Sequence, residues 1–288
     1  MEYLKKDELY KNRGYANCIS CGYHTMFDNY KNILSYTWKS ALAYLIVNFI
    51  ALSITNGFTI PTDLLNWVIW SVMLVASLSS QIYLFAHIVN VFTDQGKLIV
   101  FKKLIIMFLC QVLVAFLSLV FIYVTIIFAY QSQYGSNITM AVVALLVILL
   151  LIFGIPFYYI SIKYVAEDEQ NFVTVVRANY YKGLSHLGLI FLTSILSMLF
   201  VGVASIIIAL PLYLLMIAKL ASETGMLFGD AAGMPAYFPY LYSLTAAVTA
   251  VILMYFKTFV FSTLYYTYGS IEQRENERIG FMEHSMGI

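Results

Sequence analysis

Long stretches of apolar residues without charges constrain the fold of this chain more than any other feature. A helix needs roughly 20 mostly apolar residues to cross about 30 Å of hydrocarbon. Six stretches approach or exceed this length, at residues 40–54 with an approach from residue 30, and at 64–92, 104–130, 140–162, 187–218 and 242–268. Because 61% of the residues are hydrophobic and 11% are charged, against about 25% charged in soluble domains, we expect lipid to surround most of the chain.

These stretches should form helices, because backbone N–H and C=O groups in lipid must find hydrogen-bond partners within the embedded structure. A closed barrel would show alternating polarity over about ten residues, and the run LLVILLLIF, for example, shows none. The sequence therefore predicts an all-α, polytopic transmembrane helix bundle of about six spans. We expect a cytoplasmic lead-in at residues 1–29, a six-helix domain at 30–269 and a cytoplasmic tail at 270–288.

The distribution of Lys and Arg indicates the orientation, because loops that stay in the cytoplasm carry an excess of both. These residues are concentrated in the lead-in and its approach, in the second and fourth loops, and in the tail. The first and third loops have none, and the fifth has only Lys219 at its start. This alternation predicts that both termini lie in the cytoplasm. The polar N-terminal residues lack the apolar core of a cleavable signal peptide, so we expect the spans themselves to direct insertion.

Two prolines are expected to bend spans. Pro211 lies in the fifth apolar stretch, which is longer than a bilayer needs. Proline removes one helical hydrogen bond and clashes with the preceding turn, so we expect a kink near Pro211 or an extension that lies on the outer membrane surface. Pro156, which follows Gly154, should bend the fourth span near its cytoplasmic end.

The three helices that leave the cytoplasm each have one or more lysines just before the apolar run. Two interpretations of this similarity remain open. It indicates either a threefold repeat of helix hairpins in parallel orientation or the same preference for cytoplasmic cations acting three times.

Lys257 is the one charged residue inside an apolar span. A lysine at depth costs at least about 2.5 kcal/mol, so such residues are candidates for function. Helical spacing places it in line with Ala246 and Ala250, and small residues favour close helix contact, so we expect it to face the bundle. It is either a binding point for an anionic substrate or lipid headgroup, or a wet residue at a span that ends early. No Asp or Glu lies inside a predicted span, which argues against carboxylate-coupled transport of protons or sodium.

The second span carries an unusual number of polar residues. Ser80, His87 and Asn90 recur at helical spacing and predict a polar stripe, with Ser77 and Gln81 nearby. The stripe could line a cavity, or it could hydrogen-bond to another helix. Candidate partners are Gln111 in the third span and Asn48 in the first.

Cys18, Cys21 and His24 have the only spacing typical of a metal site. A closed zinc site needs four ligands, and the sequence offers no second cluster, so a dimer would have to complete it. The alternative is that all three are ordinary residues of a lead-in helix. We expect no disulfides on this reducing side of the membrane.

The remaining polar features favour neither catalysis nor a cofactor. The acidic stretch AEDE at residues 166–169 is expected to be a solvated face. It lacks a D-x-D or H-x-E arrangement for a metal, and the sequence contains no G-x-S-x-G or P-loop. The net charge of +1 does not indicate a nucleic-acid partner.

The run PFYYISIKYVAEDEQNFVTVVRANYYKGLSHLGLIFL at residues 156–192 and the ending TLYYTYGSIEQRENERIGFMEHSMGI resemble uncharacterised six-span bacterial membrane proteins of Bacteroidetes. The chain is also loosely similar to the non-catalytic membrane domain found beside some glycerophosphodiester phosphodiesterases. This resemblance implies a multi-pass protein of the bacterial cytoplasmic (inner) membrane and brings no functional residues with it.

Two functional hypotheses follow for a non-enzymatic protein whose first partner is the lipid bilayer. One is a permease-like bundle that handles a small molecule or a lipid, with Lys257, His87, Asn90, Gln81 and Gln111 as candidate binding residues. The other is a non-catalytic structural or assembly subunit of a membrane complex, bound to a partner protein or to a second copy of itself. An intramembrane enzyme is disfavoured, because the spans lack paired carboxylates, a histidine cluster or an activated nucleophile.

Overall fold

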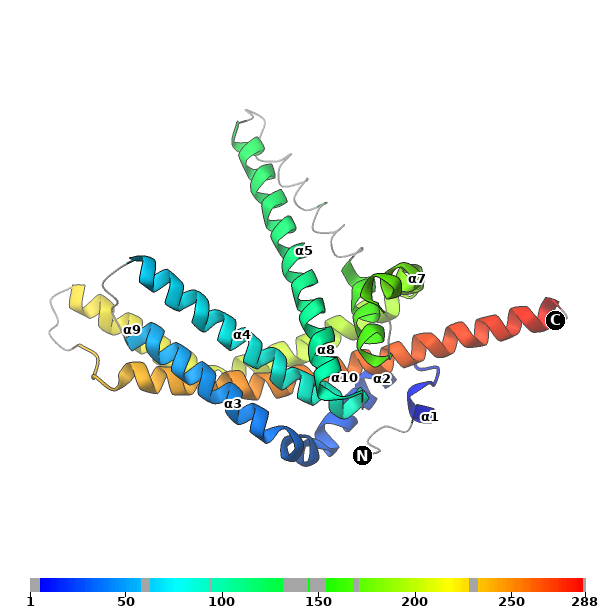
Figure 1. Ribbon diagram of the computed structural model, residues 1–288, viewed down its shortest axis with the longest axis horizontal. Coiled ribbons are helices and arrows are strands. Elements are labelled where there is room, and N and C mark those ends of the chain that lie inside the picture. Colours follow the sequence, from blue (N-terminus) through cyan, green and yellow to red (C-terminus); the bar gives the residue numbers. More distant parts are fainter. Residues whose placement is uncertain are drawn as a thin grey trace. The chain divides into compact units, whose positions relative to one another are not determined.

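The computed structural model describes residues 6–57, 63–93, 95–131, 145, 154–167, 171–227 and 233–286. In these ranges all regular secondary structure is helical, which confirms the all-α prediction (Figure 1). The chain divides into two compact units, each assembled from segments that are far apart in the sequence.

Unit 1 combines Met1–Gly22, Phe92–Ile195 and Thr263–Ile288. Its helices are α1 (Lys6–Leu9), the start of α2 (Tyr15–Asp28), α5 (Lys97–Gln131), the helical segment 154–166, α7 (Phe172–Ser185), the first turns of α8 (Leu187–Ile208) and the C-terminal part of α10 (Phe238–Met286). Its core includes the fully buried side chains of Cys18, Val100, Ile160, Val175, Ile190 and Ile271. The core therefore depends on contacts between all three sequence segments.

Unit 2 combines Tyr23–Val91 with Leu196–Ser262. It contains α3 (Tyr30–Gly57), α4 (Asp63–Thr93), α9 (Leu210–Leu227), the end of α2, and the remaining parts of α8 and α10. The helices α3, α4 and α10 lie side by side (Figure 1). The Thr37 and Tyr255 hydroxyls join α3 to α10 at 2.7 Å.

Four described helical stretches are long and apolar enough to cross a membrane: Tyr30–Thr55, Leu65–Thr93, Leu187–Ile208 and Phe238–Glu283. They correspond to the first, second, fifth and sixth predicted spans. Their outward faces carry large apolar side chains such as Trp67 and Leu199, which are 74% and 60% exposed. These features are compatible with a multi-pass membrane protein. The third predicted span lies on α5, and most of the fourth, at residues 140–162, lies outside the described residues.

The fifth apolar stretch is interrupted near Pro211, as predicted. The helix α8 ends at Ile208, Ala209 forms a turn, and α9 begins at Leu210. Proline has no N–H to donate to the carbonyl four residues earlier, so the regular ladder cannot run through this point. The bend predicted at Pro156 falls at the edge of the described residues, because residues 146–153 are not described.

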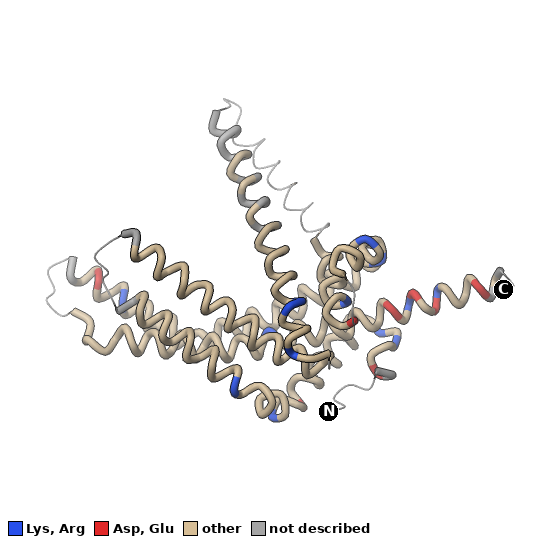
Figure 2. Tube along the Cα trace, in the orientation of Figure 1, with Lys and Arg blue, Asp and Glu red and all other residues tan. Residues whose placement is uncertain are grey.

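The structure describes both the start of α5 and the end of α10. Gly96 has a φ of +100°, a conformation that favours glycine, and its carbonyl accepts the first hydrogen bonds of α5 from Ile99 and Val100. At the other end of the chain, α10 is continuous to Met286, so it includes most of the predicted cytoplasmic tail. Figure 2 shows charged residues concentrated on this last part of α10.

Candidate functional site

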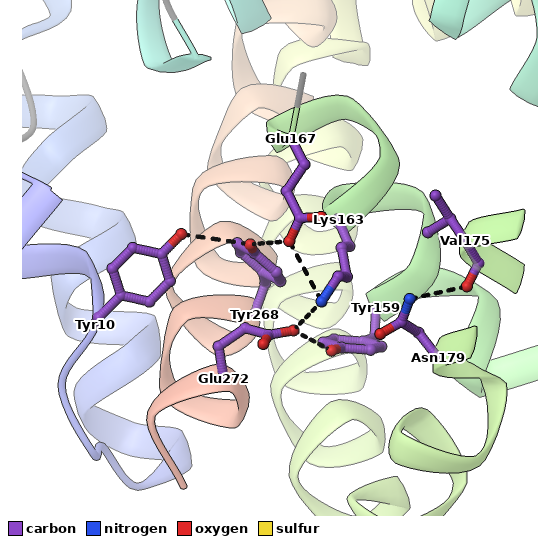
Figure 3. Close-up of polar contacts among 8 residues, drawn as sticks. All are labelled: Tyr10, Tyr159, Lys163, Glu167, Val175, Asn179, Tyr268 and Glu272. Atoms are coloured by element: carbon purple, nitrogen blue, oxygen red, sulfur yellow. Dashed lines mark hydrogen bonds and ion pairs between the residues drawn. The ribbon is translucent and has the colours of Figure 1, made fainter. Parts of the chain in front are cut away.

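A buried lysine is the clearest polar feature of unit 1. The side chain of Lys163, on the helical segment 154–166, is 9% exposed. Its ammonium lies 2.6 Å from Oε1 of Glu272 on α10 and 3.3 Å from Oε1 of Glu167, one helical turn further along the chain. Figure 3 shows these side chains converging with three tyrosines. We call this set the Lys163 cluster, and it consists of Tyr10, Tyr159, Lys163, Glu167, Tyr268 and Glu272.

The tyrosine hydroxyls extend the cluster on both sides (Figure 3). Tyr159 donates a hydrogen bond to Oε1 of Glu272, and Tyr268 donates to Oε1 of Glu167 at 3.0 Å. The Tyr10 hydroxyl lies 3.4 Å from that of Tyr268. Tyr10 is exposed, whereas Tyr159 and Tyr268 are almost completely buried. A continuous series of polar contacts therefore leads from the surface of unit 1 into its core.

The balance of charges explains how these groups tolerate burial, since removing an ion from water costs several kcal/mol unless partners replace the water. A second buried lysine, Lys103, donates to the backbone carbonyl of Glu167 and to Oε1 of Gln95 at 2.9 Å. Carbonyl groups at the end of a helix carry partial negative charge, so Lys103 stabilises the end of the segment 154–166. The two lysines balance the carboxylates of Glu167 and Glu272.

The same part of α10 holds the N-terminal segment in place. The Ser270 hydroxyl accepts a hydrogen bond from the backbone N–H of Arg13 at 2.9 Å and donates to its carbonyl at 3.0 Å. The Arg274 guanidinium donates to that carbonyl at 2.7 Å. A Cβ atom on Gly269 would lie 2.5 Å from the carbonyl oxygen of Leu9, so glycine permits this approach. The N-terminal lead-in therefore packs on α10 within unit 1.

Chemically, the Lys163 cluster can exchange ion-pair partners. Both carboxylates share one ammonium, so loss of either ion pair leaves Lys163 with the other. Buried ionisable groups with specific charged partners often occur at functional sites. Well-packed apolar side chains would serve a purely structural purpose equally well or better. For these reasons we regard the cluster as the candidate functional site.

Only part of this site was indicated by the sequence. Lys163 and Glu167 are four residues apart, a spacing that brings side chains together on a helix. Nothing local indicates that Glu272, more than 100 residues later, completes the site. The expectation that AEDE is a solvated face is wrong for Glu167, whose side chain is 28% exposed and contacts Lys163 and Tyr268. The other two acidic residues of that stretch lie outside the described residues.

Lys257 is exposed on unit 2, so the expectation that it faces the bundle is wrong. The stripe of Ala246, Ala250 and Lys257 exists on α10, but both alanines are only partly buried. A neighbouring stripe faces the core instead and includes the buried residues Ser243, Ala247, Met254 and Thr258. Burying an unpaired ammonium is costly. This cost explains why the face of α10 that carries Lys257 stays exposed while the neighbouring face packs in the core.

Polar residues on and beside the stripe of α4 hydrogen-bond to neighbouring helices, which is one of the two alternatives that the sequence left open. Asn90, which is buried, donates to the Tyr36 hydroxyl on α3 at 3.3 Å. The Ser77 hydroxyl donates to Oδ1 of Asn48 at 2.7 Å, which confirms Asn48 as a partner. Gln81 contacts the sulfur of Met254 on α10 at 3.4 Å. These polar groups therefore join helices of unit 2.

His87 and Gln111 differ in their surroundings. His87 is 8% exposed and its ring centroid lies 4.4 Å from that of Tyr83, one turn earlier on α4. Gln111, the other candidate partner of the polar stripe, is exposed on α5 in unit 1.

The three predicted metal-ligand candidates on α2 have different environments. Cys18 is fully buried, and burial raises the pKa of its thiol despite a hydrogen bond with Thr267. Cys21 is partly buried. His24 is exposed, with Nδ1 3.1 Å from Oδ2 of Asp28. Within the described ranges, no group of three or more His, Cys, Asp or Glu side chains could hold a metal ion.

Comparison with known proteins assigns no family. No protein-family model matches the chain, and searches among curated proteins and solved structures find no significant match. The resemblance to six-span bacterial membrane proteins stays a prediction.

Proposed function

We propose that the protein is a non-enzymatic, permease-like bundle of the bacterial cytoplasmic membrane that handles a small molecule or a lipid. In this proposal it has six spans and both termini in the cytoplasm. The four apolar helices support the first, second, fifth and sixth spans. The 35-residue helix α5 has no charged residue after Lys103, which supports the third span. The fourth span rests on the sequence alone.

The observation that carries the proposal is the burial of Lys163 between carboxylates from two separate elements of unit 1. In the proposed topology, the cytoplasmic end of the fourth span and the end of the last span meet at this cluster. A shared ion pair can hold these ends together in one state and release them in another. Such a change between two discrete arrangements is what a permease-like cycle requires.

Two assays on purified protein in liposomes test this function. Light scattering after an osmotic step measures entry of glycerol, glycine and acetate, and dithionite quenching of a fluorescent phospholipid measures lipid movement between leaflets. We expect wild-type protein to accelerate at least one process over protein-free liposomes. Glu272→Gln should change that rate, whereas the exposed Glu283→Gln on the same helix should not. Rates equal to those of protein-free liposomes in both assays would refute the permease-like function.

The orientation has an independent test. Reporter fusions at residues 58 and 134 should report the outer side, and fusions at the two ends should report the cytoplasm. If residue 58 or 134 reports the same side as the ends, the six-span topology is wrong.

A second candidate function is favoured by the exposed apolar residues on the last part of α10. Ile279, Phe281 and Met282 are 45%, 77% and 43% exposed, and such residues are typical of an interaction surface. A structural or assembly subunit would cover them with a partner protein or a second copy of the chain. Light scattering of the solubilised protein tests the second copy. A wild-type dimer that Phe281→Ser converts to a monomer would support it, and a wild-type monomer would exclude it.

A further inference from the structure

Three exposed lysines of unit 2 lie on helices that touch one another. Lys31 and Lys39 are on α3, and Lys257 is on α10. In the part of the chain that the structure describes, none of them forms an ion pair with a carboxylate. The acidic residue nearest to Lys31 in the sequence, Asp28, contacts His24 instead.

Contacts between α10 and the start of α3 show where Lys257 lies along the length of these two helices. Tyr255 shares a 2.7 Å hydroxyl contact with Thr37, and Phe256 has its ring centroid 6.2 Å from that of Phe27 at the end of α2. Lys257 is two residues from Tyr255, and Lys39 is two residues from Thr37. At about 1.5 Å and roughly 100° per residue, each lysine therefore lies about 3 Å along its helix from this contact, on the side of its helix that faces away from it.

Aromatic rings accompany these lysines. The Lys39 ammonium lies 5.7 Å from the ring centroid of Trp38, and that of Lys31 lies 5.9 Å from the ring of Tyr30. Both rings are about half exposed. Tryptophan and tyrosine favour the headgroup level of a membrane, and lysine extends its ammonium to the same level. The start of α3 therefore has the composition of a membrane interface.

We propose that Lys31, Lys39 and Lys257 form a band around the outside of unit 2, in which each lysine binds the phosphate of an anionic phospholipid headgroup. Lysine binds phosphate as a flexible point charge, and basic residues at the surface attract anionic lipid. Lys257 fits this function because it is exposed at interface level although its own helix is apolar around it. The band lies on the outside of unit 2, and its lipid binding does not depend on permease activity.

The experiment compares two lipids in detergent micelles. Delipidated protein receives phosphatidylglycerol or phosphatidylcholine with the same acyl chains, and the thermal midpoint is measured at equal lipid fraction. We expect a higher midpoint with phosphatidylglycerol for the wild type. Lys39→Gln/Lys257→Gln should lose most of this difference, while Lys39→Arg/Lys257→Arg should keep it. Lys219→Gln, which removes an exposed lysine elsewhere in unit 2, should also keep it.

For each variant, the thermal midpoint in phosphatidylglycerol is compared with that of the same variant in phosphatidylcholine. A general change in stability shifts both midpoints and therefore does not affect the comparison. In the wild type, high salt should reduce the preference for phosphatidylglycerol, because screening weakens exposed charge contacts. An undiminished difference in Lys39→Gln/Lys257→Gln would overturn the proposal. So would an equal shift produced by inorganic phosphate, since the site would then bind free anions rather than lipid.

Discussion

Replacement of Glu272 by glutamine tests the role of the Lys163 cluster in stability. The Glu272 carboxylate accepts hydrogen bonds from the Lys163 ammonium at 2.6 Å and from the Tyr159 hydroxyl. The side chains of Lys163 and Glu272 are only 9% and 13% exposed, so water screens the pair poorly. Hydrogen bonds to charged groups contribute about 1.5–3 kcal/mol each, and removal of one partner from a buried ion pair costs about 3–5 kcal/mol.

Glutamine keeps the shape and one acceptor oxygen, and Lys163 keeps its contact with Glu167 at 3.3 Å. We therefore expect Glu272→Gln to lower the free energy of unfolding by about 2–3 kcal/mol, near the lower end of these values. For a chain of this size, about 2–4 °C per kcal/mol gives a fall in thermal midpoint of roughly 4–12 °C. Circular dichroism of the protein in dodecyl maltoside measures this change.

Two comparisons make the result specific to the ion pair. Glu283→Gln makes the same chemical change at an exposed position on α10 and should alter stability by less than about 0.5 kcal/mol. Lys163→Met combined with Glu272→Gln should be less destabilising than the sum of the two single changes, because the charges are removed together. A Glu272→Gln protein as stable as the wild type, or strictly additive effects, would refute the reasoning.

Three further predictions concern packing, thiol reactivity and helix contacts. Gly269→Ala should destabilise the protein by about 1–3 kcal/mol, since its Cβ would overlap a backbone oxygen of the N-terminal segment; Gly188→Ala, in open space, should be neutral or stabilising in the same thermal assay. Cys18 should react with maleimide at neutral pH far more slowly than Cys21, because it is buried and its raised pKa lowers the thiolate fraction; mass spectrometry that finds equal rates in native protein would contradict this. Asn48→Ala removes the acceptor of a serine hydroxyl on α4 and should cost about 0.6–2 kcal/mol in a denaturant titration, whereas no measurable loss would show that this contact contributes little.

Much of the fold was predictable, because apolar length and helical periodicity are local properties of the sequence. The break near Pro211 followed from the chemistry of a single residue, and Asn48, one of two candidate partners of the polar residues on α4, accepts a hydrogen bond from Ser77. The orientation of Lys257 was predicted wrongly. Its stripe of small residues favoured the interior, but an adjacent stripe packs there, and local spacing does not decide between two neighbouring faces.

The sequence by itself determined that the chain is helical and contains apolar helices of membrane length, because every backbone group in lipid must be paired within the helix that carries it. Only the tertiary structure decided that Lys163 lies between Glu167 and Glu272, and that residues near Arg13 pack on α10. Lys163 and Glu272 are more than 100 positions apart, and Arg13 and Ser270 are more than 250 positions apart. Partners so far apart leave no periodic pattern, since their meeting depends on how whole helices pack.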